Sequence, residues 1–137
     1  MRKHIVYITS LYLLCSFSPQ KKIFIEKIKI GQFYYNIYRE HKHSYNENMV
    51  SDFYVVYNEQ NSQMCSGYIS AKHMNRLAIT GRYIYNDKKL VITTHYQPDY
   101  IKSTDSSIST FYPNMKGKLI LINHRDFKDG KVKEYKY

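Results

Sequence analysis

The histidines are the side chains best suited to metal or acid–base chemistry in this chain of 137 residues. His41 and His43 form a His-x-His pair in a polar stretch, and two imidazoles at this spacing can begin a metal site. Further ligands would have to come from distant segments, with His73, His95 and His124 as candidates. None of them follows metal-ligand spacing, so we interpret the histidines as surface residues and predict no metal ion. Whether the five converge in space stays open.

Nucleophilic catalysis has less support in the sequence. No glycine-rich phosphate loop, H-E-x-x-H, G-x-S-x-G or C-x-x-C motif is present. Cys65 lies in the strand-like stretch SQMCSGYIS without a nearby histidine, so we expect it to be a buried apolar residue. Glu59, Asp99 and Asp105 are scattered carboxylates. We therefore predict no catalytic residue and no cofactor, although catalytic groups can converge from remote positions.

Lysines near the C-terminus are the best candidates for binding. The chain has 21 Lys and Arg against 11 Asp and Glu, a net charge of +10, without a block of five or six like charges. Two predicted turns are flanked by Lys116, Lys118, Lys128, Lys131 and Lys133. If these turns lie at one end of the sheet, the lysines form a patch for an anionic surface or a protein partner. The alternative is that they are solvated edge charges.

Specific nucleic-acid binding is not expected, because the sequence has no recognition helix and no known RNA-binding aromatic motif.

The N-terminus resembles a secretory signal. Arg2 and Lys3 precede a largely apolar stretch, residues 5–17, which is too short to span a bilayer comfortably. We predict a signal helix over residues 1–18, followed by cleavage and no transmembrane span in the mature chain. Two alternatives remain: a lipoprotein with a lipid on Cys15, or a native first strand or helix.

The body, residues 19–137, reads as a single β-rich domain. Sixteen tyrosines, many isoleucines and valines, and few glycines and prolines favour strands. Residues 77–85 and 89–96 alternate apolar and polar side chains around the turn NDKK, as in an antiparallel sheet with one solvated side. We predict an all-β fold: a single antiparallel sheet or sandwich of about eight strands, built from successive hairpins behind the signal helix.

The C-terminal segment gives the clearest hairpin signal. Asp129-Gly130 suits a type I′ turn, which needs positive φ at both central residues. A turn there sets a register with one apolar and two opposite-charge pairs: Phe127 with Val132, Asp126 with Lys133, and Arg125 with Glu134. We interpret the tail as a hairpin and not as a free arm.

The same region resembles the MORN-variant repeats of many bacterial secreted and antitoxin-like proteins. In those repeats an aromatic pair precedes an Asn-Gly-Lys-type turn, and a Tyr/Phe-Lys-Asp-Gly-Lys turn closes the next hairpin. The matching residues are Phe111, Tyr112, Asn114, Gly117 and Lys118, then the run 127–131, with a fainter copy at GRYIYNDKKL. The match covers about residues 81–137, with Met115 and Lys116 inserted and the usual tryptophans absent. It implies stacked hairpins and a binding or scaffolding role.

These observations favour a non-enzymatic, extracytoplasmic binding or structural protein that is periplasmic or secreted. One alternative is an antitoxin- or immunity-like protein-binding partner, which would be cytoplasmic if the signal interpretation is wrong. The other is a small hydrolase with a histidine-containing site, which requires histidine and carboxylate groups to cluster. The ligand and the oligomeric state do not follow from the sequence.

Overall fold

The chain folds into one antiparallel sheet whose strands follow one another in chain order. The computed structural model describes residues 21–44, 48–97 and 105–137. The predicted signal helix and Cys15 lie outside these residues. Within the described ranges there is no helix, and therefore none long and apolar enough to cross a membrane. The nine strands are β1 (Lys22–Ile30), β2 (Phe33–Ser44), β3 (Met49–Asn58), β4 (Gln63–His73), β5 (Arg76–Tyr85), β6 (Leu90–Tyr96), β7 (Ser106–Pro113), β8 (Leu119–Lys128) and β9 (Lys131–Lys136).

The all-β prediction and the C-terminal hairpin are confirmed. Asp129 and Gly130 have φ of 50° and 74°, as a type I′ turn requires. The β8–β9 register joins the three residue pairs expected from the sequence. β5 and β6 also pair as an antiparallel hairpin, as the sequence predicts for residues 77–85 and 89–96. Tyr83 lies opposite Ile92, and the register continues without a break to Tyr85 and Leu90.

Two segments differ from the sequence interpretation. The polar run of residues 40–48 predicts a loop, but β2 continues to Ser44 in register with β3, and its Arg39 and His41 contact Asp52 of that strand. The run KHMNR, residues 72–76, indicates a short helical turn or a connection and carries no hairpin signal. They form a tight β4–β5 hairpin instead, with Met74 and Asn75 at φ of 50° and 62°.

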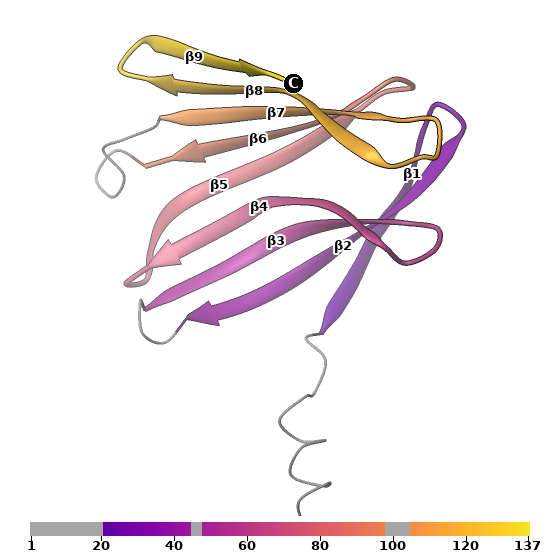
Figure 1. Cartoon of the computed structure of the whole chain (residues 1–137). Coiled ribbons are helices and arrows are strands. Elements are labelled where there is room, and N and C mark those ends of the chain that lie inside the picture. Colours follow the sequence, from indigo (N-terminus) through magenta and orange to yellow (C-terminus); the bar gives the residue numbers. More distant parts are fainter. Residues whose placement is uncertain (1–20, 45–47, 98–104) are drawn as a thin grey trace, which may run out of the picture.

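The sheet divides where β4 and β5 separate. These strands pair only between residues 70–73 and 76–80, and beyond that point they diverge (Figure 1). We call β1–β4 the N-terminal leaf and β5–β9 the C-terminal leaf. A Cβ on Gly81 would lie 1.9 Å from the Tyr68 carbonyl oxygen, so only glycine permits this approach of the backbones.

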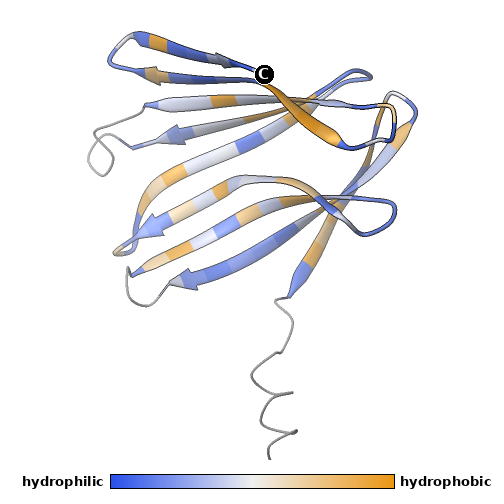
Figure 2. Cartoon of the chain, in the orientation of Figure 1, coloured by the Kyte–Doolittle hydropathy of each residue, from blue (hydrophilic) through white to orange (hydrophobic). Residues whose placement is uncertain are grey.

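The main core forms between the two leaves. Its buried residues from the N-terminal leaf are Ile28, Ile30, Tyr35, Ile37 and Val56, and those from the C-terminal leaf are Leu90, Ile92 and Leu119. The side chain of Tyr35 is fully buried, and its hydroxyl donates a 2.6 Å hydrogen bond to the Gly117 carbonyl. Figure 2 shows that β8 is hydrophobic over its first half, where it joins this core, whereas β9 is mainly hydrophilic.

We predict that Gly130→Val destabilises the β8–β9 hairpin. Nothing lies within 4 Å of a Cβ built on Gly130, so the cost comes from the positive φ alone. We expect a loss of roughly 1–3 kcal/mol in the free energy of unfolding. Urea unfolding would measure it, with Lys131→Val as a β-branched control next to the turn. Equal effects of the two variants would contradict the assigned turn.

Candidate functional site

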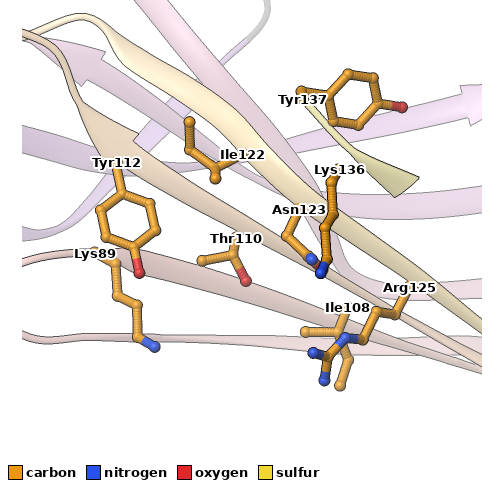
Figure 3. Close-up of a pocket in the computed structure, with 9 residues that line it drawn as sticks. All are labelled: Lys89, Ile108, Thr110, Tyr112, Ile122, Asn123, Arg125, Lys136 and Tyr137. Carbon is orange, nitrogen blue, oxygen red and sulfur yellow. The ribbon is translucent and has the colours of Figure 1, made fainter. Parts of the chain in front are cut away.

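A basic hollow on the C-terminal leaf is a candidate binding site. Its volume is about 490 Å³. Figure 3 shows Lys89 and Tyr112 on one side, Arg125 and Lys136 on the other, and Thr110 between them. The full lining is Lys89, Ile108, Thr110, Tyr112, Ile122, Asn123, Arg125, Lys136 and Tyr137.

Strand pairing brings most of these side chains to one side of the sheet. Cross-strand partners share a side, as do residues two apart in one strand. The register pairs Ile108 with Arg125, and Thr110 with Asn123, which in turn pairs with Lys136. Most of the hollow is thus built across the three neighbouring strands β7, β8 and β9, and Lys89 precedes β6.

A β-bulge in β8 adds the apolar part of the lining. Thr110 pairs with Asn123 while Phe111 pairs with Leu121, so Ile122 is the extra residue. Because a bulge redirects side chains, the adjacent residues Ile122 and Asn123 both line the hollow. The Tyr137 amide donates a 2.9 Å hydrogen bond to the Ile122 carbonyl, which fixes the C-terminal tyrosine beside the bulge.

The charge of the hollow is positive. Lys89, Arg125 and Lys136 line it, and no carboxylate does. Glu134 lies beside it and accepts hydrogen bonds from Asn123 Nδ2 at 2.7 Å and from Arg125 Nε at 3.1 Å. These two hydrogen bonds lower the pKa of Glu134, with the Arg125 and Lys136 charges adding to them. The Glu134 carboxylate orients Arg125. The other two cations of the lining, Lys89 and Lys136, have no carboxylate beside them in the lining.

Such a lining favours an anionic ligand with some apolar surface. The ammonium and guanidinium groups supply charge-assisted hydrogen bonds to carboxylate or phosphate oxygens. The exposed rings of Tyr112 and Tyr137 and the side chain of Ile122 supply apolar contact.

The five lysines predicted from the sequence lie elsewhere and form two groups. Lys116 and Lys118 precede β8, whereas Lys128, Lys131 and Lys133 surround the turn after it. The ten-residue strand separates the groups by about 30 Å at the usual rise per residue. The five ammonium groups therefore do not form one patch.

The second group lines a hollow of about 710 Å³ together with acidic residues. Its lining is Asp126, Lys128, Asp129, Lys131, Val132, Lys133 and Tyr135. Lys133 pairs with Asp126 across the strands, and its Nζ lies 5.3 Å from the Tyr135 ring centroid. Acidic neighbours offset part of the charge of these lysines, and their binding role stays a prediction.

The five histidines of the described residues do not converge on a metal site. Within the part of the chain that the structure describes, no group of three or more His, Cys, Asp or Glu side chains could hold a metal ion. Cys65 is a half-buried free thiol whose pKa is raised to about 12 by burial, so it is a poor nucleophile at neutral pH.

His41 joins an ion-pair cluster on the N-terminal leaf. Asp52 Oδ1 lies 2.9 Å from His41 Nδ1, and Asp52 Oδ2 lies 2.8 Å from an Arg39 guanidinium nitrogen. Burial raises the pKa of Asp52, but the hydrogen bonds and charges of Arg39 and His41 lower it by more, and the net shift is downward.

A second histidine cluster has the composition of a serine-hydrolase triad. Ser109 Oγ lies 2.8 Å from His124 Nδ1, and His124 Nε2 lies 2.9 Å from Asp126 Oδ1. Ser109 and His124 are cross-strand partners, and Asp126 follows two residues later on the same side of β8. The three groups are partly exposed, so a reagent can reach them.

The sequence reasoning missed both the basic hollow and this cluster. The predicted β8–β9 register already implied that Asn123 faces Lys136, which was the available signal for the hollow. The bulge at Ile122 and the β7–β8 register carry no local sequence signal, so the remaining lining residues and the Ser109–His124 contact required the structure.

Compared with known proteins, the chain matches no protein-family model, no curated protein and no solved structure. The resemblance to MORN-variant repeats therefore stays a prediction.

We predict that Asp52→Asn destabilises the protein at neutral pH and not in strong acid. A carboxylate with a lowered folded-state pKa stabilises the fold above its unfolded pKa near 4, and this stabilisation disappears as pH falls through the folded-state pKa. Because Arg39 is half exposed and its ion pair is screened by solvent, we expect Asp52→Asn to lower the free energy of unfolding by about 1 kcal/mol at pH 7.

Urea unfolding at neutral pH and near pH 2 would measure the effect, with Asp87→Asn in an exposed turn as the control for removing one carboxylate. A loss of stability that persists undiminished in acid would show that the Asp52 charge is not its source.

Proposed function

We propose that the protein is a non-enzymatic, exported binding protein that holds an acidic segment of a partner protein in its basic hollow. The observation that carries this proposal is the lining of Lys89, Arg125 and Lys136 without a carboxylate. An extended peptide suits the shallow shape of the hollow across β7–β9. Its carboxylates would contact the cations, and its apolar side chains would contact Tyr112 and Ile122.

The expected affinity is modest and salt-dependent. Contacts between exposed charges contribute about 0.2–1 kcal/mol each, and salt screens them. Arg125 is already oriented by Glu134, so it loses less conformational freedom on binding than a free side chain would.

The compartment separates this proposal from the antitoxin- or immunity-like alternative. In our proposal the signal is removed after residue 18 and the mature domain is periplasmic or secreted. In the alternative the chain stays in the cytoplasm and keeps Met1. Both use the same hollow, so the test of the hollow below applies in either compartment.

We predict that charge reversal in the hollow weakens binding to an acidic probe. The probe is a fluorescent peptide of alternating Glu and Tyr, with affinity measured by fluorescence anisotropy at low and physiological salt. Lys89→Glu with Lys136→Glu should lower the affinity about tenfold, since two favourable charge contacts become repulsive.

The matched control is Lys116→Glu with Lys128→Glu, which changes the net charge equally at the two turns. It should lower the affinity less than about threefold. A larger loss in the control would place binding at the sequence-predicted lysines, and equal losses would reduce the interaction to net charge.

One observation favours the hydrolase alternative. In the Ser109–His124–Asp126 cluster, the Ser109 hydroxyl can donate to His124 Nδ1 while His124 Nε2–H donates to Asp126. An attacking Ser109 Oγ would pass its proton to His124 as it bonds to an ester carbonyl, and His124 would return that proton to the leaving alkoxide. Water would then hydrolyse the acyl-serine.

Labelling with a fluorophosphonate tests this alternative. A hydrolase would incorporate the label at Ser109, and both Ser109→Ala and His124→Ala would abolish it, with Ser106→Ala as the control. Under the binding proposal we expect no stoichiometric labelling, and the cluster then acts as a cross-strand hydrogen-bond network. Intact-protein mass spectrometry distinguishes the two results.

A further inference from the structure

One side of the N-terminal leaf combines aromatic rings with lysines. Strand pairing places Phe24 beside Tyr38 and Phe53 beside Tyr68 on this side. Side chains two residues apart in a strand point to the same side, which adds the lysines and the remaining tyrosines. We call this set the aromatic–lysine face: Lys22, Phe24, Lys27, Lys29, Tyr34, Tyr38, Lys42, Phe53, Tyr57 and Tyr68.

Each lysine of this face lies over an aromatic ring. Lys22 Nζ is 4.1 Å from the centroid of Tyr57, and Lys42 Nζ is 5.6 Å from that of Phe53. Lys27 and Lys29 approach Tyr34 to 4.9 and 5.5 Å. The four lysines are exposed. Among the described residues, the register brings one carboxylate, Glu40, to this side. The face is therefore strongly basic.

Exposed apolar side chains continue the face along β1. Ile23 is 52%, Phe24 55% and Ile25 40% exposed. Phe24 pairs with Tyr38 and lies on the face, whereas Ile23 pairs with Arg39 on the opposite side of the sheet. Ile25 is the extra residue where the register shifts between Phe24 and Glu26. β1 is also an edge strand, with β2 as its one neighbour in the sheet. The three residues form an exposed apolar strip at this edge of the sheet, in which Phe24 shares its side with Lys22 and Lys27.

We propose that the aromatic–lysine face and the exposed strip of β1 bind an anionic lipid surface. Lysines attract acidic headgroups, and tyrosine rings are favoured at the boundary between headgroups and hydrocarbon. Phe24 would enter the outer part of the bilayer, as apolar side chains of peripheral proteins do, with Ile25 at the sheet edge next to it. The basic hollow belongs to the other leaf, so this inference goes beyond the proposed function.

The geometry of the rings favours lipid over single-stranded nucleic acid. Base stacking needs open ring faces. The Phe24–Tyr38 and Tyr38–Tyr57 pairs meet edge to face, with interplanar angles of 70° and 90°, so they form no continuous stacking platform. The exposed isoleucines give a base nothing to recognise, whereas lipid chains accommodate them.

Sedimentation with vesicles tests the proposal on the full domain. Vesicles of phosphatidylcholine alone are compared with vesicles containing about a quarter phosphatidylglycerol, at low and physiological salt. We expect binding to the anionic vesicles only, weaker at higher salt. Lys27→Glu with Lys29→Glu should lower the partition coefficient by about tenfold or more, given about fivefold per lysine near a charged membrane.

Matched controls separate the face from general charge and hydrophobicity. Phe24→Ser should weaken vesicle binding several-fold, whereas Ile84→Ser should not, because Ile84 is similarly exposed at 59% but lies on the C-terminal leaf. Lys72→Glu with Lys88→Glu repeats the charge change outside the face. Circular dichroism verifies that each variant is folded, and the hollow variant Lys89→Glu with Lys136→Glu should retain most vesicle binding.

Three outcomes would overturn the proposal. Equal binding to neutral and anionic vesicles, or none to either, removes the role of the lysines. Equal losses in the control variants remove the role of the face. Tighter binding to a single-stranded oligonucleotide, or a dimer that Phe24→Ser converts to a monomer, would assign the surface to nucleic acid or to a second copy of the chain.

Discussion

The hydrogen bond from the buried Tyr35 hydroxyl to the Gly117 carbonyl joins the two leaves of the sheet. A phenol without a partner would be costly at this position, because a buried polar group must replace its hydrogen bonds to water. Burial also raises the pKa of Tyr35 to about 12, so the hydroxyl remains a donor even in moderately alkaline solution. The β7–β8 turn must therefore lie over β2 for the core to close.

Glycine at position 117 is part of the same constraint. Its φ is +84°, and a Cβ there would lie 2.6 Å from a ring carbon of Phe33. A second backbone contact supports the closure, because the Gly31 amide donates to the Asp87 carbonyl at 2.6 Å. These contacts tie the turns of both leaves together at one end of the molecule. The far ends of β2, β3, β8 and β9 take no part in them, and the histidine clusters lie there.

The division of the sheet also decides which surfaces remain for binding. The C-terminal leaf contributes Leu90, Ile92 and Leu119 to the core. Its opposite side carries the basic hollow, which Thr110 and Arg125 line. The N-terminal leaf buries Ile37 and Val56 against the same core and leaves its aromatic–lysine face on the other side. One core thus supports two basic surfaces with different chemistry.

Local sequence signals accounted for the hairpins and not for the closure of the leaves. Asp129-Gly130 set the β8–β9 register because turn chemistry and cross-strand charge pairs act within a few residues. The Met74-Asn75 turn was missed because neither residue is glycine, although asparagine tolerates positive φ. The Tyr35–Gly117 contact and the Ile122 bulge depend on packing between distant segments, for which composition and alternation contain no signal.

The strict chain order of the strands has a consequence for how the protein folds. Each strand pairs only with its sequence neighbours, so most contacts close short loops, and such topologies fold quickly for β proteins. The contact between Tyr35 and Gly117 spans 82 positions and carries a larger loop-closure entropy than the hairpins do. Hairpins would therefore zip up first, and docking of the leaves would limit the rate. The edge strand β1 is open to pairing with other chains before and after docking, so its bulge protects the folding intermediate as much as the native state.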